Sequence, residues 1–586
     1  MLVETQTRPG HHRVDVALAI LVALLALAVR IDSIGFNSLS EDETAKWQAV
    51  QQYRQGHFAG VNSEHPMMLK LLAWGSIAAG ERWNRFASQH RWPTISPEAS
   101  LRIPNVLFGA ATAAILYFLC RLAMGIAGSF AAGFFWAVSP LTIGLNRLAK
   151  EETALCFFTV LACYCYRRAK KGETDTSTRR WFDFSACAFG LATASQYVFH
   201  LFGLNALAWH LAGRRGLDQK PLGSRSVRFL IVMGLVFFLA NPFVLSPASI
   251  SYALHWLHHD GIRHTGYDFS GSLYRNFPSL LLAGVPWYFY VWMLLVKTPI
   301  PILVAILVGS MLLLRDRRSI GSCFFLTMGL LQFACLSISG AKWMRYSLWF
   351  LPFLYLAAGY GVHVGWNYAR QKRIPVASGL AALVVLAWPL LNLIAWKPYY
   401  PMYLNAIGGG MKNVTRYFAP DEVSEFDTRE VAQQICPSAP RGMTVATGRP
   451  ASMTYYLMRC GRSDLNVVAL YDPLYMPGEG DRIVLEGYRR FFETQRYFDL
   501  LTPSAMPRNQ VQTGLVSAST ILVFQPSAVV AGSKSESTAH SSATSTSSQR
   551  KHSSAHASGA IAELLEGEVS RGSDGACFRK GWVCYG

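Results

Sequence analysis

Long apolar runs, separated by short polar segments, fill the first two-thirds of the chain. Each run is close to the roughly 20 residues that a helix needs to cross a bilayer. The pattern therefore predicts a polytopic α-helical membrane protein with about 11 transmembrane helices in residues 1–396. The expected spans are 14–34, 102–121, 128–146, 152–168, 183–198, 200–213, 228–246, 298–314, 320–339, 346–366 and 374–396.

Three apolar segments have alternative interpretations. Segment 14–34 resembles a signal peptide, but no cleavage site stands out and a long polar loop follows, so we expect an uncleaved first helix. Segment 200–213 is short, and it either spans alone or forms a kinked hairpin with the preceding helix. Segment 281–296 is crowded with aromatic residues, which favours an interfacial helix over a further span.

The short loops between these spans predict an orientation. Four loops are rich in Lys and Arg, namely 166–181, 213–228, 315–318 and 370–373. With the expected spans, all four fall on the side of the N-terminus, which the positive-inside rule makes cytoplasmic. Loops 35–101 and 247–297, and everything after residue 396, are then extracytoplasmic. We expect a multi-pass protein of the bacterial inner membrane.

After residue 396 the long apolar runs end, and segments of mixed polarity follow. The segments TVATG, NVVAL and STILVF have the composition of strands, whereas FDTREVAQQI and IVLEGYRRFFETQRYF read as helices. We expect a small extracytoplasmic α/β domain in 397–525. Residues 526–559 are rich in Ser, Thr and Ala, and we expect 526–586 to be a low-complexity, disordered tail.

Composition agrees with the hydropathy pattern. Only 15% of the residues are charged, against about 25% in soluble domains. The net charge of +19 lies largely in the loops, which argues against nucleic acid as a partner. Two cysteine pairs outside the spans, Cys436 with Cys460 and Cys577 with Cys584, are candidate disulfides in an oxidising compartment. Neither pair has zinc-site spacing, so no structural metal is expected.

The outer loop 35–101 carries acidic residues beside the membrane, Glu41-Asp42-Glu43 and Glu64. They are either solvated loop residues or working groups, because a carboxylate is costly to bury near a bilayer. Two carboxylates from one loop can face one cavity, one as a general base and one orienting a substrate. After Glu64, His65 and Pro66 lead into a short apolar helix with Lys70, which we expect to lie along the outer surface.

A second outer loop, 247–278, is rich in histidine. His255 and His259 have the i, i+4 spacing of a helical metal pair, and Asp260 could supplement them. Interfacial histidines are the commoner interpretation, and the loop also holds His258 and His264. We expect no metal site and no cofactor.

Several motifs occur in order along the chain. They are Asp42-Glu43, Glu64-His65-Pro66, Leu101-Arg102-Ile103-Pro104, Ala149-Lys150-Glu151-Glu152, Lys297-Thr298-Pro299, Arg345-Tyr346, Leu351-Pro352, Pro401-Met402-Tyr403-Leu404-Asn405 and Gly408-Gly409-Gly410. This ordered set, over residues 14–420, resembles the protein O-mannosyltransferase and aminoarabinose-transferase group of GT-C glycosyltransferases. Each motif alone is weak.

The resemblance implies a GT-C fold and inverting transfer of a sugar from a polyprenyl phosphate on the outer face of the membrane. It makes Asp42 the base that acts on the acceptor, Glu43 its neighbour, and Glu64 a second carboxylate near the acceptor. Glu41 leaves a one-place ambiguity in the base. The chain reads His-Pro-Met where the mannosyltransferases usually read His-Pro-Pro.

A phosphate leaving group needs cations for stabilisation, and the fork of an arginine suits this task. The candidates on the outer side are Arg102, Lys297, Lys342 and Arg345, with Arg345 beside Tyr346 as the first choice. His65 and Lys70 are further candidates for substrate contact. Each cation is otherwise an interfacial anchor, and Lys150 and Glu151 could simply pair with each other.

The expected partners are a polyprenyl-phosphate-linked sugar, a protein or lipid/glycan acceptor, and membrane lipid. Two alternatives remain, a metal-dependent oligosaccharide transferase of the same broad fold and a polytopic transporter. A transporter predicts an internal repeat with broken spans at matching positions, and no such repeat is evident in the sequence.

Overall fold

The computed structural model describes most of residues 9–525. Within that range it leaves out 59, 64, 172–173, 197–223, 258–265, 316–319, 419–426, 487–489, 500–507 and 514–515. The expected span 200–213 and the tail with Cys577 and Cys584 therefore lie outside the described residues.

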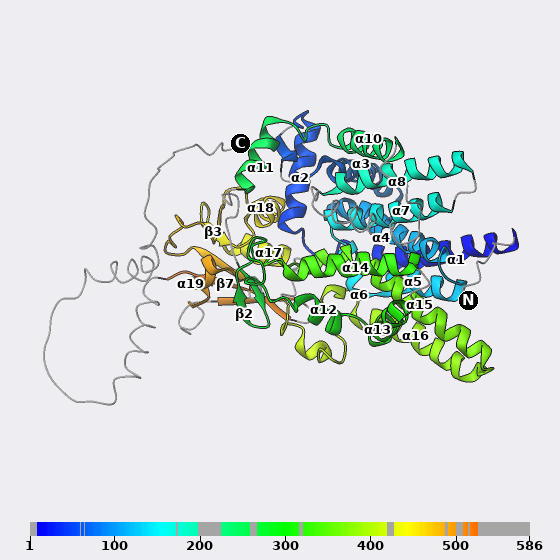
Figure 1. The fold of residues 1–586 in the computed structure, drawn as a ribbon. Helices are drawn as coiled ribbons and strands as arrows, with labels where there is room; N and C mark the ends of the chain where they lie inside the picture. The colour runs from blue at the N-terminus through cyan, green and yellow to red at the C-terminus, as the bar shows by residue number, and fades with distance from the viewer. Residues whose placement is uncertain are drawn as a thin grey trace, which may run out of the picture.

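The larger part of the fold is a bundle of helices (Figure 1). Its first half consists of α1 (Pro9–Ile31), α4 (Pro97–Arg121), α5 (Ile126–Val138), α6 (Pro140–Asn146), α7 (Glu151–Lys170) and α8 (Asp175–Ser195). Its second half consists of α10 (Ser224–Ala240), α11 (Pro247–Leu257), α12 (Phe289–Lys297), α13 (Ile300–Arg315), α14 (Ile320–Ile338), η2 (Met344–Trp349), α15 (Leu351–Gln371) and α16 (Pro375–Trp396). One continuous apolar core runs through both halves.

The expected span 128–146 is broken in the structure. Its two pieces, α5 and α6, meet at Ser139 with a bend of 59°. Pro140 begins α6 and cannot continue the hydrogen-bond ladder of α5. The carbonyls left open at the end of α5 are satisfied by buried Arg30, which donates to Trp136 O at 3.0 Å and Ala137 O at 3.1 Å.

Two other expected boundaries differ. The span expected from residue 346 begins as η2 and becomes helix α15 only at Leu351, where Pro352 occupies the first turn. Of segment 281–296, the structure forms helix only in α12, whose nine residues are too short to cross a bilayer.

The length and composition of the described helices bear on how many of them cross a membrane. Among the described residues, two helices are long and apolar enough to cross a membrane, His12–Ile31 within α1 and Pro97–Arg121. The bent pair α5 and α6 adds a third if it counts as one span. Four described apolar helices or helix segments are shorter, so the expected number of about 11 remains a prediction.

The loop 35–101, which the sequence predicts to be extracytoplasmic, folds into α2 (Glu41–Arg54), η1 (Gly60–Asn62) and α3 (Met67–His90). Helix α2 begins at a capping box, in which the Ser40 hydroxyl accepts from Glu43 N and Glu43 Oε2 accepts from Ser40 N at 3.0 Å. Helix α3 begins directly after Pro66, as the sequence predicted. A small hairpin of β1 (Tyr267–Phe269) and β2 (Ser272–Tyr274) lies in the second outer loop.

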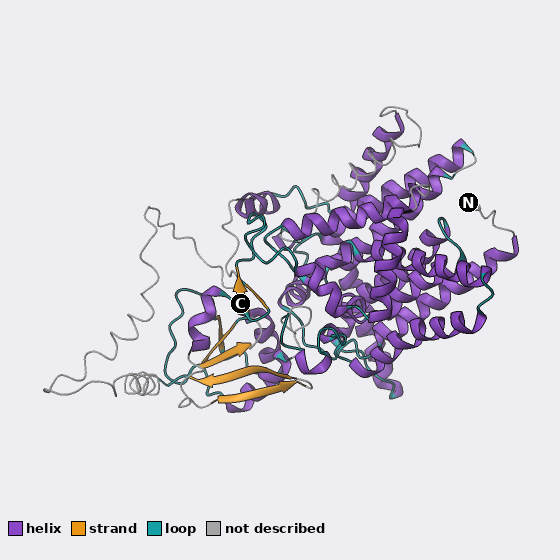
Figure 2. Cartoon of the chain, turned by 60° about the horizontal axis from the view of Figure 1, so that its bottom comes forward, coloured by secondary structure: helices purple, strands orange, loops and turns teal. Residues whose placement is uncertain are grey.

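The sheet of the C-terminal domain lies at one end of the helical part (Figure 2). The connection after α16 contains the short helices η3 (Tyr400–Met402) and η4 (Gly410–Asn413). The helices of the domain are α17 (Thr428–Ser438), α18 (Pro450–Arg459), η5 (Phe492–Thr494) and α19 (Gln495–Asp499). The strands are β3 (Thr444–Thr447), β4 (Asn466–Ala469), β5 (Arg482–Glu486), β6 (Arg508–Thr513) and β7 (Val516–Val523). They pair in the order β4-β3-β5-β7-β6, parallel among the first three and antiparallel after β5.

One expected element of this domain is wrong. The start of IVLEGYRRFFETQRYF was predicted to be helical, but Arg482–Glu486 is the central strand β5. Four of the five residues in this strand are buried, and the strand pairs with β3 on one side and β7 on the other. Its continuous apolar run therefore suits a buried strand. The expected strands TVATG, NVVAL and STILVF and the helix in FDTREVAQQI are confirmed.

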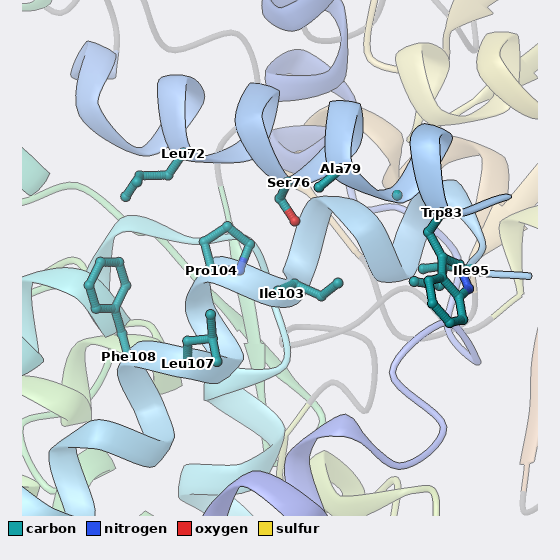
Figure 3. Close-up of a pocket in the computed structure, with 10 residues that line it drawn as sticks. Leu72, Ser76, Ala79, Trp83, Ile95, Ile103, Pro104, Leu107 and Phe108 are labelled. Atoms are coloured by element: carbon teal, nitrogen blue, oxygen red, sulfur yellow. The ribbon is translucent and has the colours of Figure 1, made fainter. Parts of the chain in front are cut away.

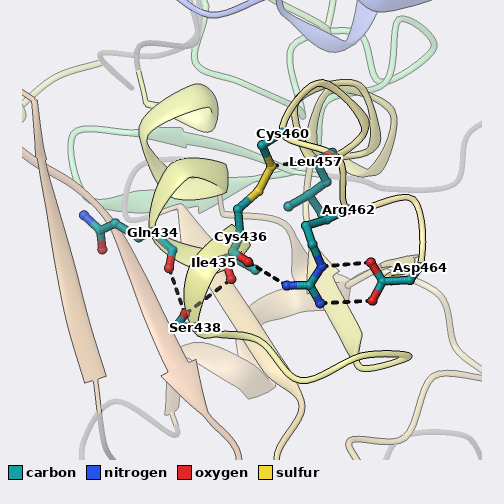
Figure 4. Close-up of a disulfide and its surroundings, with 8 residues drawn as sticks. All are labelled: Gln434, Ile435, Cys436, Ser438, Leu457, Cys460, Arg462 and Asp464. Carbon is teal, nitrogen blue, oxygen red and sulfur yellow. Dashed lines mark hydrogen bonds and ion pairs between the residues drawn. A yellow bond between two sulfur atoms is a disulfide. The ribbon is translucent and has the colours of Figure 1, made fainter.

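The candidate disulfide of this domain is present. Cys436 on α17 is bonded to Cys460, which follows α18 (Figure 4). Beside it, Arg462 donates to Cys436 O at 2.6 Å and forms two hydrogen bonds with Asp464. The bond links α17 to the residue that directly follows α18.

Candidate active site

Three consecutive charged residues at the start of α7 form the centre of a charged network. Their ion pairs are Lys150–Asp42, Glu151–Lys46 (Oε1–Nζ 2.8 Å) and Glu152–Arg345 (Oε1–Nε 3.1 Å). Asp42 and Lys46 belong to α2, whereas Arg345 belongs to η2. The network therefore joins three segments that lie far apart in the sequence. Lys150 and Glu151 are adjacent, yet each forms its ion pair with α2.

The backbone before α7 is held in place by Asn105 of α4. Its buried side-chain amide donates to Leu148 O at 2.5 Å and to Lys150 O at 2.6 Å. These bonds satisfy carbonyls in the turn that precedes the helix and fix where the helix begins. The backbone that carries Lys150, Glu151 and Glu152 is consequently fixed relative to α4.

Glu43 and Arg102 form a buried ion pair. Two hydrogen bonds join them, Nε to Oε1 at 2.8 Å and Nη2 to Oε2 at 2.7 Å, and neither side chain is more than 1% exposed. Arg102 also donates to the carbonyls of Ile34, Asn37 and Ser38. Its guanidinium is thus engaged with the outer loop in this structure.

Glu43 is ionised despite its burial. Desolvation opposes ionisation, but the charge of Arg102 and hydrogen bonds from Arg102, Ala149 N and Ser40 N outweigh it and lower the pKa of Glu43. Ala149 N donates to Glu43 Oε1 at 2.9 Å. The Glu43 carboxylate therefore connects α2 with α4 and with the turn that precedes α7.

The three consecutive acidic residues of α2 have different environments, because successive positions on a helix point about 100° apart. Glu41 accepts from Ser452 N of the C-terminal domain at 2.9 Å. Glu43 is fully buried, whereas the Asp42 side chain is 35% exposed. Asp42 lies at the solvent-accessible edge of the network.

Glu151 is a buried acid of the network, with a side chain 3% exposed. Burial again opposes ionisation, but the charges of His65 and Lys46 hold the pKa of Glu151 well below its usual range. His65 Nδ1 lies 3.8 Å from Glu151 Oε1, and the His65 side chain is 26% exposed. The motif Glu64-His65-Pro66 thus reaches the network through His65, while Glu64 lies outside the described residues.

Lys70 supports the loop that carries His65. Its buried ammonium donates to Val61 O and to His65 O, the latter at 2.8 Å. These contacts satisfy the charge with backbone carbonyls and hold the start of α3 against the loop.

Lys297 and Lys342 are both buried against backbone carbonyls. Lys297 donates to Pro401 O at 2.7 Å, and Lys342 donates to Val285 O at 2.7 Å. Burial lowers the pKa of Lys342 to about 8. Backbone carbonyls thus accept hydrogen bonds from both ammonium groups.

Arg345 is the most exposed of the predicted phosphate-binding cations, with a side chain 20% exposed. Its guanidinium carbon lies 4.7 Å from the centroid of Trp343 and 5.3 Å from that of Tyr346. Tyr346 in turn stacks on Trp349. Stacking on aromatic faces orients the planar guanidinium.

Glu152 has an unsatisfied oxygen. Its side chain is 3% exposed, and Oε2 has no hydrogen-bond partner among the described residues. A buried acceptor without a partner is costly. Its position beside Arg345 makes this oxygen suitable for a ligand hydroxyl or N–H group.

An apolar cavity of about 500 Å³ opens between α3 and α4 (Figure 3). Leu72, Ala79 and Trp83 line it from α3, and Pro104, Leu107 and Phe108 line it from α4. Pro104 lies two residues after Arg102 on α4, so one end of the cavity is within a helical turn of the residue that pairs with Glu43.

The structure shows participants that the sequence did not single out. Lys46, Asn105 and Glu152 were not predicted as site residues, yet all three hold the network together. The spacing of Asp42 and Lys46, i and i+4 on one helix face, was a usable signal. The histidine-rich segment adds nothing further, because 258–265 lies outside the described residues and only the backbone of His255 is described.

Comparisons with known proteins agree with this fold. The family described as dolichyl-phosphate-mannose-protein mannosyltransferase matches residues 94–245. ArnT from Cupriavidus metallidurans in the apo state is similar with a TM-score of 0.53 and 14% identity, covering 87% of this chain and 98% of that one. The oligosaccharyltransferase from Archaeoglobus fulgidus in the apo form has a TM-score of 0.48 and 12% identity, covering 77% and 64%. The comparison with curated proteins finds no match.

The resemblance inferred from the ordered motifs is confirmed, because the family match and the likeness to ArnT point to the same GT-C group. The fold is mostly helical with a small sheet region toward the C-terminus, as expected. At 14% identity the likeness to ArnT establishes the fold and leaves the reaction to be argued from the site.

Proposed function

We propose that this protein is a membrane glycosyltransferase that moves a sugar from a polyprenyl-phosphate donor to an extracytoplasmic acceptor, with inversion at the anomeric carbon. One observation carries the proposal. Residues from three separate motifs, Asp42, Lys150 to Glu152 and Arg345, meet in one charged network within a GT-C fold. The acceptor is a protein hydroxyl or a lipid or glycan hydroxyl.

Asp42 is the proposed general base. Its side chain is 35% exposed, and the other two carboxylates of the acidic triplet are bonded to the C-terminal domain and to Arg102. Its carboxylate takes the proton of the acceptor hydroxyl while the hydroxyl oxygen bonds to the anomeric carbon. The bond from that carbon to the phosphate oxygen breaks on the opposite face, and polyprenyl phosphate leaves.

Arg345 is the proposed phosphate-binding residue. Arg102, Lys297 and Lys342 are at most 3% exposed, whereas the Arg345 side chain is 20% exposed. A guanidinium stabilises the charge that develops on the leaving phosphate without transferring a proton. We assign Arg102, Lys297, Lys342 and Lys70 to positioning of the surrounding backbone, and His65 and Tyr346 to the border of the substrate site.

The apolar cavity between α3 and α4 suits the alkyl part of a lipid substrate. Its lining is almost entirely apolar, and it lies beside a helix turn that carries Arg102. Burying a prenyl chain there would contribute about 0.8 kcal/mol for each buried methylene. We further propose that the protein lies in the bacterial inner membrane, with a cytoplasmic N-terminus and an extracytoplasmic C-terminal domain.

The test is sugar transfer in membranes from a panel of radiolabelled polyprenyl-phosphate sugars. Wild type should transfer label from at least one donor, and Asp42→Asn should lose at least about 100-fold in rate, the usual contribution of a general base. Asp464→Asn, which changes an exposed aspartate of the C-terminal domain, is the matched control and should retain activity.

The anomeric configuration of the product, determined by NMR, tests inversion. Full activity of Asp42→Asn at normal expression would overturn the role of Asp42. Transfer that disappears on chelation and returns with a divalent cation would favour the metal-dependent alternative.

A further inference from the structure

The C-terminal domain is bonded directly to the segment that carries the proposed base. Both carboxylate oxygens of Glu41 accept hydrogen bonds from the first turn of α18, from Ser452 N at 2.9 Å and Ala451 N at 3.4 Å. Glu41 is the first residue of α2 and precedes Asp42. The C-terminal domain therefore contacts the residue that directly precedes the proposed base in the sequence.

The same helix also holds the residues before α2. The Ser452 hydroxyl donates to Leu39 O at 2.6 Å, and Leu39 N donates to the Tyr456 hydroxyl at 2.8 Å. Tyr456 also donates to Glu98 Oε1 of α4 at 3.0 Å. Both backbone polar groups of Leu39 are thus bonded to α18, and Leu39 itself is fully buried.

Arg429 of α17 extends this contact toward α1. Its guanidinium donates to Phe36 O at 2.6 Å, and its backbone N–H donates to the Ser38 hydroxyl at 3.0 Å. The ring of Tyr455 on α18 packs against Trp47 of α2, with 5.7 Å between centroids. Helices α17 and α18 together contact Phe36, Ser38, Leu39, Glu41 and Trp47, which lie on both sides of Asp42 in the sequence.

The position of Glu41 at the start of α18 is one that favours a negatively charged group. Helix α18 follows the parallel strand β3, and ligands of open α/β sheets bind at the carboxyl ends of such strands. The unpaired N–H groups of a helix start attract anions there. In this protein the site at the start of α18 is occupied by Glu41 of the same chain.

We propose that the C-terminal domain helps to position the proposed base of the active site and that Glu41 is the positioning residue. By binding the start of α18, Glu41 fixes the first turn of α2 and thereby directs Asp42 toward Lys150 and the acceptor. This inference rests on the proposed function, because the positioned group is the proposed base. It also separates the roles of two adjacent acids, with Asp42 acting on substrate and Glu41 acting through the backbone.

The test compares Glu41→Gln, Tyr456→Phe and wild type in steady-state transfer assays. A side-chain amide cannot accept both N–H bonds as a carboxylate does, and Phe removes the hydroxyl that bonds Leu39. We expect kcat to fall about tenfold or more in each variant, while KM for the donor changes less than about twofold, because a displaced base weakens the transition state alone. Glu479→Gln, an exposed glutamate of the same domain, is the matched control and should behave as wild type.

Hydrogen exchange of the full-length protein supplies a readout that does not depend on activity. Amides of residues 38–54 should exchange faster in both variants than in wild type and in the control. Unchanged kcat in both variants, or unchanged exchange in this segment, overturns the proposal. If wild type transfers no sugar but exchange rises as expected, the contact is real and the proposed function is what fails.

Discussion

Glu43 Oε2 lies 2.7 Å from Arg102 Nη2, and this fully buried ion pair joins the first turn of α2 to α4. Breaking a buried pair by removing one partner leaves a charge without compensation and costs about 3–5 kcal/mol. We therefore expect Glu43→Gln and Arg102→Met each to lower stability by roughly this amount. Thermal unfolding in detergent measures it.

The matched control for this pair is Arg54→Ala, which removes one partner of an exposed pair with Glu81. Exposed pairs contribute at most about 1 kcal/mol, so this variant should unfold almost as wild type does. Equal losses for the buried and the exposed pair would contradict the structural role of Glu43 and Arg102.

Acid stability should depend on the same network. The pKa values of Glu43 and Glu151 are lowered in the folded state, so the unfolded chain binds more protons in the acidic range. Their contribution is fully present above about pH 4.3, the ordinary pKa of a glutamate, and is lost as pH falls below it toward the folded-state values.

Stability measured by denaturant unfolding between pH 6 and pH 3 checks this sign. Wild type should lose stability steeply below about pH 4.3. Glu43→Gln should be less stable at pH 6 but show a shallower acid slope. An acid slope identical to that of wild type would show that Glu43 ionises normally in the folded protein.

Substitution of Arg345 should affect transfer more than stability. Arg345→Lys retains a charge but loses the planar fork and the stacking on Trp343 and Tyr346. We expect a loss of about 10- to 100-fold in kcat/KM, and a larger loss for Arg345→Ala. Arg416→Lys is a control, because Arg416 also lies over a tyrosine but belongs to no described part of the network. Wild-type activity in Arg345→Lys would exclude bidentate phosphate binding.

The Cys436–Cys460 bond provides a test of orientation. A disulfide forms in an oxidising compartment, so this domain should be reachable from outside the cytoplasm. In spheroplasts, a membrane-impermeant maleimide should label these cysteines only after reduction with an impermeant reductant. Arg370→Cys, placed in an expected cytoplasmic loop, should stay unlabelled until the membrane is opened. The reverse pattern would invert the predicted topology.

Much of the helical part was predictable from local sequence. The apolar runs of α1, α4 and α7 and the capping box of Ser40 and Glu43 are short-range features, and they specify helices wherever the chain places them. Strand β5 was missed because a short apolar run has no periodicity that separates a buried strand from a helix. Its character depends on β3 and β7, which lie elsewhere in the sequence.

The chemistry divides in a similar way. Local sequence is enough to identify the candidate charged groups, including the acidic triplet at Glu41 to Glu43, the charged start of α7 and Arg345. Only the tertiary structure decided their partners, with Glu41 on α18, Asp42 on Lys150 and Glu43 on Arg102. Adjacent helical residues point in different directions, and what each one meets depends on segments distant in the chain. Spacing along the sequence therefore identifies the candidate groups, while packing assigns each of them a role.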